Sequence, residues 1–148
     1  MKQFEKWTRL KCTDVLFDSN IDNWRIGASV FNERIIGKKQ LIFLIEEEDG
    51  EKFGYYFNTE ITEYNFGRTE TNEKSFHFNL ESNGRLKYPM KFEIKDLKWS
   101  GYYLFKKSDN WLIAFGDIEL FKENMKNESY CRQDENSFDY HGIEKALC

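Results

Sequence analysis

The chain has 148 residues and a formal net charge of -4, and 40% of its residues are hydrophobic and 18% aromatic. One proline and nine glycines exclude a low-complexity or disordered chain, and the length fits one globular domain at residues 1–148. The excess of acids lies from Asp117 onward. Because an acidic surface repels phosphates, this composition disfavours a non-specific nucleic-acid binder.

The cysteines and the N-terminal residues indicate the compartment. Cys12, Cys131 and Cys148 form no Cys-x-x-Cys pair, and their odd number fits a reducing compartment better than a disulfide scaffold. The chain begins without the apolar segment of a signal peptide, and its longest apolar run, residues 41–45, is too short to span a bilayer. We therefore expect a cytoplasmic protein without membrane insertion, in which the glycosylation sequon at residues 127–129 stays unused.

The first half of the chain predicts a strand, a helix and a hairpin. β-branched and aromatic residues predict a strand at 13–18, and apolar residues at helical spacing predict a helix at 25–36 that ends before Gly37. Residues 41–45 show no alternation of apolar and polar side chains, which indicates a central strand covered on both faces. A three-residue loop ending at Gly50 then pairs Ile45 with Phe53 and Glu46 with Lys52.

A second hairpin follows from alternation in the middle of the chain. Phe76, Phe78 and Leu80 alternate with polar residues, so we expect them to point inward and His77 to point outward. A three-residue loop, Ser82-Asn83-Gly84, keeps the apolar side chains of both strands together, whereas a two-residue Asn83-Gly84 turn reverses one face. Pro89 is expected on the outer face, at an edge or a bulge. The expected pairs are Leu80 with Leu86, Phe78 with Tyr88 and Phe76 with Met90.

The last elements complete an antiparallel fold. Residues 102–105 and 111–115 predict another strand pair, which the polar loop 106–110 joins, and the chain turns polar after Phe121. Strands with hairpin signals, one early helix and an irregular end predict a mainly β (α+β) fold. In this fold, two packed antiparallel sheets form a β-sandwich with a few short flanking helices.

Several segments together resemble the TLDc domain family in the same order along nearly the whole chain. The chain departs from the family where Asp117-Ile118-Glu119 replaces a run of glycines, and where residues 143–148 replace a Glu-Val-Trp-Gly ending. The matching segments are Val15-Leu16-Phe17-Asp18-Ser19, residues 41–45, Phe53-Gly54-Tyr55-Tyr56, residues 76–80, Ala114-Phe115-Gly116 and Ser129-Tyr130-Cys131.

The resemblance implies a sandwich of two antiparallel sheets, a link to protection against oxidative stress and, as in several family members, binding to the vacuolar proton pump. The family has no agreed catalytic residues, so the resemblance assigns none. We expect a non-catalytic protein-interaction module whose partner contact is its acidic C-terminal region, because an excess of acids steers a basic partner. The acids chosen for this contact are Glu123, Glu128, Asp134 and Glu135.

One loop partly matches a calcium-binding motif. Asp18, Asn20 and Asp22 occupy the first, third and fifth ligand positions of an EF-hand loop. Asn23 stands where the motif has glycine, and Ser29 stands where it requires a bidentate glutamate. We therefore favour an Asp/Asn-rich turn whose side chains cap the following helix.

Cysteine chemistry is a further alternative, as a thiol-dependent antioxidant enzyme. Cys131 and His141, with Asp134 or Asp139, have the residue types of a Cys-His-Asp arrangement. Nucleophilic catalysis needs the imidazole within hydrogen-bond reach of the thiol and a lowered thiol pKa, which acidic surroundings oppose. We favour a packing role for Cys131, with a redox-sensing thiol as the alternative.

A basic stretch carries the nucleic-acid alternative. Six aromatic residues stand among the bases between residues 85 and 107, and such a mixture binds single-stranded nucleic acid. Because Tyr88 and Phe92 are expected to point inward, we favour a solvated strand face. No zinc motif or phosphate-binding glycine loop is present, so we assign no catalytic, cofactor or metal residues. The bases are Arg85, Lys87, Lys91, Lys95, Lys98, Lys106 and Lys107.

Overall fold

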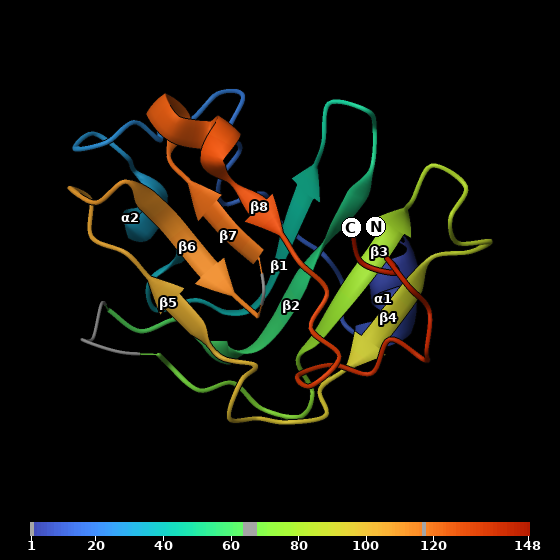
Figure 1. Ribbon diagram of the computed structural model, residues 1–148. Coiled ribbons are helices and arrows are strands. Elements are labelled where there is room, and N and C mark those ends of the chain that lie inside the picture. Colours follow the sequence, from blue (N-terminus) through green and yellow to red (C-terminus); the bar gives the residue numbers. More distant parts are fainter. Residues whose placement is uncertain (1, 64–67, 117) are drawn as a thin grey trace.

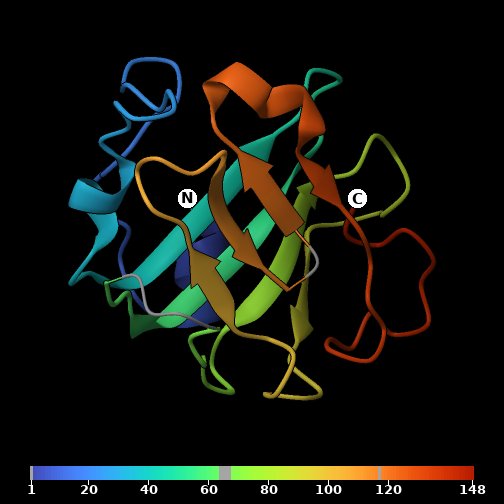
Figure 2. The same cartoon turned by 60° about the vertical axis from the view of Figure 1, so that its left-hand side comes forward.

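The computed structural model describes residues 2–63, 68–116 and 118–148, so Asp117 of the acidic segment lies outside the described residues. Its strands form two antiparallel four-stranded sheets that face each other (Figures 1 and 2). This arrangement confirms the predicted mainly β, sandwich-like fold. The first sheet has the order β1 (Lys39–Glu46), β2 (Lys52–Glu60), β3 (Phe76–Glu81), β4 (Met90–Glu93), and the second β5 (Tyr102–Leu104), β6 (Trp111–Phe115), β7 (Ile118–Phe121), β8 (Tyr130–Cys131).

The helices are short. They are α1 (Lys2–Thr8), α2 (Phe31–Ile35) and the 3-10 helix η1 (Glu123–Glu128). Among the described helices, none has the length and apolar character that crossing a membrane requires.

The inner faces of the two sheets meet in an aromatic core. Tyr55 and Phe57 of β2 face Phe115 of β6, with ring centroids 5.6 and 5.8 Å apart, and Phe57 also meets Tyr102 of β5 at 5.0 Å. The Tyr55 hydroxyl donates a hydrogen bond of 2.9 Å to the Ser100 carbonyl, and burial raises the pKa of Tyr55. Because each buried ring removes ~150–250 Å² from water, these contacts hold the sheets together.

Helix α1, which the sequence did not predict, covers the outer face of the first sheet (Figure 1). Phe4 packs on Phe78 with ring centroids 4.7 Å apart, and Trp7 packs on Phe76 at 5.9 Å. The first sheet is therefore covered on both faces, and buried rings lie on each side of β3.

Strand β1 lies at the edge of the first sheet, so the prediction of a central strand is wrong. Leu41, Phe43 and Ile45 pack against the core between the sheets, while Ile42 packs against the cluster under α1. Leu44 is exposed. Residues 41–45 therefore lack alternation because α1 covers the outer face of the sheet, and not because β1 has a neighbouring strand on each side.

Of the two N-terminal elements predicted from the sequence, the strand is wrong and the helix is shorter than predicted. Residues 13–18 form no strand, and of residues 25–36 only α2 is helical. The Ile26 amide donates to the Asn124 side chain at 3.1 Å, and the Gly27 amide donates to the Lys107 carbonyl at 2.8 Å. These bonds tie the segment before α2 to η1 and to the loop between β5 and β6.

The first hairpin has the predicted register. Ile45 pairs with Phe53, and Glu46 pairs with Lys52, whose ammonium lies 3.2 Å from the Glu46 carboxylate. Gly50 has a φ of +93°, the left-handed conformation that glycine adopts without strain.

The second hairpin has a different register from the predicted one. Phe78 lies opposite Lys91, and His77 lies opposite Phe92, three residues away from the expected pairing. An odd shift exchanges the two faces of a strand. His77 therefore points into the core, and the expected outward orientation of His77 is wrong.

The two-residue turn of this hairpin accounts for one residue of the shift, and the irregular segment after it accounts for the other two. Asn83 and Gly84 have φ values of +50° and +86°, which are typical of the two-residue turn that the sequence interpretation rejected. The residues between this turn and β4 form no strand, and they leave Tyr88 67% exposed. The predicted inward orientation of Tyr88 is therefore wrong, and Pro89 lies just before β4.

The C-terminal segment covers the part of the first sheet beside β3 and β4 (Figure 1). Backbone hydrogen bonds join it to the edge of β4, from Lys95 to Ser137 at 2.8 Å and from Asp139 to Glu93 at 2.9 Å. Leu147 is fully buried, and its carbonyl accepts a 2.8 Å hydrogen bond from the Asn79 side chain.

A disulfide joins Cys131 of β8 to Cys148, so the expectation of unpaired cysteines is wrong; Cys12 is the free cysteine. Gln133 positions the tail, since its side chain donates to the Ile143 carbonyl at 2.7 Å and accepts from the Ala146 amide at 2.6 Å. The tail returns to β8 through these contacts, which cysteine spacing alone does not show.

Candidate functional site

Four aromatic side chains lie side by side on the outer face of the second sheet. Side chains alternate along a strand, so Tyr103 points outward between Tyr102 and Leu104, both of which are buried in the core. Trp111 pairs with Phe121 across β6 and β7 and shares its face. We call Tyr103, Phe105, Trp111 and Phe121 the aromatic stripe.

The rings of the aromatic stripe form one continuous chain of contacts. The ring centroids of Tyr103 and Phe105 lie 6.4 Å apart, and those of Phe105 and Trp111 lie 5.5 Å apart with planes inclined by 26°. Trp111 and Phe121 follow at 5.1 Å. The stripe therefore crosses from β5 over β6 to β7 without a break.

None of the four rings is buried. Tyr103 is 43% exposed and Trp111 36%, and Phe105 and Phe121 are half-buried. Single exposed apolar side chains are common on protein surfaces, but a contiguous exposed patch marks an interaction site. Tryptophan and tyrosine also dominate the binding energy of protein interfaces. The stripe is therefore the candidate functional site.

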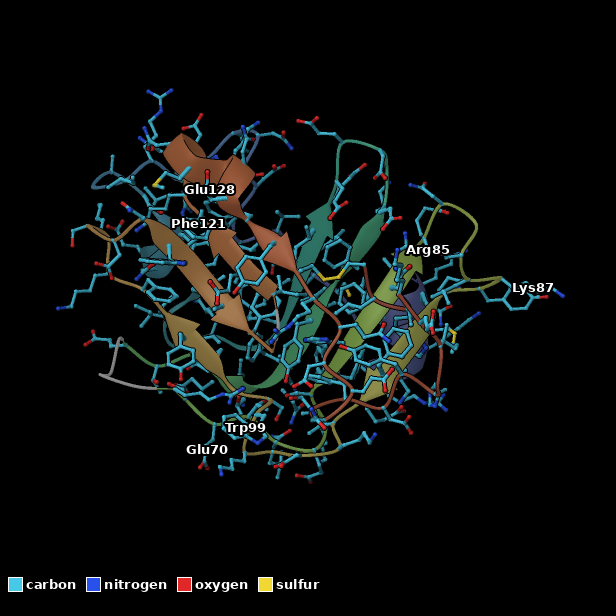
Figure 3. All side chains as sticks on the ribbon, in the orientation of Figure 1. Glu70, Arg85, Lys87, Trp99, Phe121 and Glu128 are labelled. Carbon is cyan, nitrogen blue, oxygen red and sulfur yellow. A yellow bond between two sulfur atoms is a disulfide. The ribbon has the colours of Figure 1, made fainter. Side chains whose placement is uncertain are left out.

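Acidic groups border the aromatic stripe. Glu119 lies on the same sheet face, opposite Ala114 on one side and the exposed Tyr130 on the other. Glu128 lies beside Phe121 (Figure 3), and the hydroxyl of its neighbour Ser129 accepts a 2.9 Å hydrogen bond from the Phe121 amide. Neither glutamate forms an ion pair within the described part of the chain. The border of the stripe therefore favours positive charge.

A buried lysine fixes the loop that joins Phe105 to Trp111. The Lys122 ammonium donates hydrogen bonds to the carbonyls of Lys106 at 2.7 Å and Lys107 at 3.1 Å, and to that of Asp109. Desolvation lowers the pKa of Lys122, and the Asp109 carboxylate opposes this. Because all three protons of the ammonium are used, the loop holds both rings in place before any partner arrives.

We expect the Lys122→Met substitution to lower the free energy of unfolding by about 2–4 kcal/mol, because it removes charge-assisted hydrogen bonds from a buried position. Urea unfolding followed by circular dichroism measures this loss. Lys126→Met, at an exposed position of η1, is the matched control and should change stability by less than ~0.5 kcal/mol. Equal losses in the two variants would show that Lys122 does not anchor the loop.

The loop that partly matches the calcium-binding motif closes on itself. Asp18 accepts hydrogen bonds from the Asn20 amide and side chain at 2.9 and 3.0 Å, and Asp22 accepts one from the Asp18 amide at 2.9 Å. Asp22 also lies 3.6 Å from Arg34. No group of three metal-ligating side chains occurs among the described residues. The side chains stabilise their own turn, and Val30, the N-cap of α2, has no side-chain capping bond.

The alternative Cys-His-Asp arrangement has no thiol, because Cys131 is bonded to Cys148. His141 is exposed and lies 3.5 Å from Asp139. Asp134 stabilises its own loop: burial raises its pKa, but hydrogen bonds from Ser137 and Asn136 and the charge of Arg132 outweigh this, and its pKa is lowered.

The acids predicted to contact a partner do not form one patch. Glu123 lies 2.7 Å from Arg25, Asp134 belongs to its own loop, and Glu128 and Glu135 are exposed. Helix η1 and the loop at 134–138 lie at opposite ends of the second sheet in both views (Figures 1 and 2). Of the four, Glu128 borders the aromatic stripe.

The basic stretch is likewise divided. Lys87 and Trp99 lie at different edges of the molecule (Figure 3). Arg85 binds the buried Glu51 carboxylate, Lys91 lies 2.9 Å from Glu93, and Lys107 lies 3.2 Å from Glu33. The remaining members include Lys95, which donates to the Glu135 carbonyl, and Lys98, which lies over the ring of Trp99.

His77 is the buried polar residue that the sequence interpretation misplaced. Its ring stacks on Phe138 with centroids 3.8 Å apart, and its Nδ1 lies 3.0 Å from the Tyr140 hydroxyl. Burial lowers the pKa of His77 to about 3. Because no solvent reaches the ring, we assign His77 to the core.

A hollow of about 340 Å³ beside α1 is a weaker candidate. Tyr56 and Phe76 line it together with Trp7. Two of its charged side chains are already matched, since Lys91 lies 2.9 Å from Glu93 and over the ring of Phe76.

Comparisons with protein-family models, curated proteins and solved structures found no match for this chain. The TLDc resemblance therefore stays an expectation from the sequence.

Proposed function

We propose that this protein is a non-catalytic interaction module that binds a protein partner through the aromatic stripe. The observation that carries the proposal is the unbroken row of four rings on an open sheet face, with Trp111 and Tyr103 exposed. Burying such rings against a partner removes a large apolar area from water, and the fixed loop beside them limits the entropy lost on binding.

The TLDc resemblance suggests the partner. Family members protect against oxidative stress and several bind the vacuolar proton pump, so we propose this pump as the partner and stress protection as the role. The support is the ordered set of segments; those after residues 15–19 fall on β1, β2, β3, β6 and β8, whereas residues 15–19 form no strand. The register of the second hairpin adds no support for the resemblance, because Phe78 and Tyr88 do not pair.

We expect the Trp111→Ala substitution to weaken binding to the purified proton pump at least tenfold, or about 1.4 kcal/mol. Surface plasmon resonance with the folded variant measures this loss of affinity. Trp99→Ala is the matched control, because Trp99 is 49% exposed but lies away from the stripe. Binding that Trp111→Ala leaves unchanged contradicts the assigned surface, and the absence of binding by the native domain removes the pump as partner.

A second candidate is a nucleic-acid-binding regulatory factor, which the surroundings of Trp99 favour. Arg68 and Lys98 lie over its ring, at 5.7 and 4.8 Å from the centroid, and an exposed ring with cations is a platform for stacking bases. A gel shift with single-stranded RNA, compared between the native chain, Trp99→Ala and a Lys87→Ala, Lys91→Ala, Lys95→Ala variant, separates this candidate from the first.

A further inference from the structure

The aromatic stripe and its acidic border specify a kind of ligand. The rings accept apolar groups that can stack on them, and Glu119 and Glu128 favour positive charge beside the rings. Two cations near the stripe are already engaged, since Lys122 is buried and Lys107 lies 3.2 Å from Glu33. A ligand that fits both features combines stacking groups with arginine or lysine.

The position of the rings selects among the ways of binding a peptide. Strand addition uses the backbone at a sheet edge, whereas the stripe lies on the face of β5, β6 and β7. At the β5 edge, Tyr102 already exchanges backbone hydrogen bonds of 2.8 and 2.9 Å with Thr69. Polyproline II segments instead dock on aromatic side chains, and their preformed backbone lowers the entropy lost on binding.

We infer that the aromatic stripe binds a proline-rich, basic segment of the partner in the polyproline II conformation. This inference rests on the proposed function and names the chemistry of its partner. Prolines stack on Trp111 and its neighbours, and an arginine or lysine of the segment pairs with Glu119 or Glu128. A second copy of this chain does not supply the segment, because Pro89 is its single proline. Nucleic acid is disfavoured here, since the carboxylates repel phosphates.

The test uses the full chain and a short fluorescein-labelled peptide of prolines with one arginine at each end, followed by fluorescence anisotropy. We expect saturable binding below about 1 mM, a loss of at least about tenfold in Trp111→Ala, and native affinity in Trp99→Ala. The double variant Glu119→Gln, Glu128→Gln should bind about threefold to tenfold more weakly at low salt and nearly like the native chain at high salt.

A control peptide keeps both arginines but replaces the prolines with alternating serine and glycine. Equal affinity for this peptide overturns the inference, because charge alone then explains binding. The inference is also overturned if single-stranded RNA or a neutral oligosaccharide binds the aromatic stripe and the proline peptide does not. If the proline peptide fails while Trp111→Ala still abolishes binding to the proton pump, the inference is wrong and the proposed function stands.

Discussion

We expect the domain to lose about 4–5 kcal/mol of stability as the pH falls from 7 to 3, because the unfolded chain gains a proton on His77 that the folded chain does not accept. The pKa of His77 is lowered from 6.5 to about 3 by complete burial. Between these two values the unfolded state binds more protons, so the free energy of unfolding decreases as the pH decreases. Below the folded pKa the loss is complete.

Urea unfolding at a series of pH values measures this slope. The variant His77→Asn keeps a polar atom near the Tyr140 hydroxyl but does not titrate in this range. It should be less stable than the native chain at pH 7 and show a shallower decrease between pH 6.5 and 4. His141→Asn, which removes an exposed histidine, should keep the native slope. A native slope in His77→Asn would contradict the assignment, since another group would then carry the acid sensitivity.

The second large effect concerns the C-terminal disulfide. We expect Cys148→Ser to lower the free energy of unfolding by about 3 kcal/mol, because the Cys131–Cys148 bond closes a loop with a sequence separation of 17 and so restricts the unfolded chain. Urea unfolding with and without a reductant measures this loss. Reduced native protein should match the variant, and Cys12→Ser should leave stability nearly unchanged.

Thiol titration supplies an independent check. The native chain should show one reactive thiol, at Cys12, before reduction and three after it. Three thiols in the untreated protein would show that the tail is not bonded to β8, and the expected difference between native and variant chains would then disappear.

Alternation predicted strands at β3 and β4 but neither their register nor which face of β3 is the core. The first hairpin has one acceptable register, since Glu46 and Lys52 pair only when Gly50 ends the loop. In β3, Phe76 and Phe78 point away from the second sheet and are covered by α1. The polar His77 and Asn79 point inward, where His77 Nδ1 lies 3.0 Å from the Tyr140 hydroxyl and the Asn79 side chain donates to the Leu147 carbonyl. A strand covered on both faces carries no polar face that marks the solvent.

The sequence did not reveal the aromatic stripe for the same reason: alternation does not show which face of a strand is exposed. Tyr103 stands between two inward residues, so the sequence shows that it faces the other way, but not that this side stays open. Helix α1 covers Phe76 and Phe78 on the outer face of the first sheet, whereas no described element covers the aromatic stripe on the outer face of the second sheet. The pairing of Trp111 with Phe121 is the signal that could have revealed the stripe. This pairing depends on the bulge between Trp111 and Ile113.

Site-specific photo-cross-linking in living cells tests the central claim most directly. A photoreactive phenylalanine analogue at position 111 or 103 places the probe on the aromatic stripe, and the same analogue at position 99 or 88 replaces exposed rings outside it. We expect a discrete cross-linked protein band from positions 111 and 103 and none from 99 and 88. Adducts that form only at 99 or 88 would show that the partner binds elsewhere.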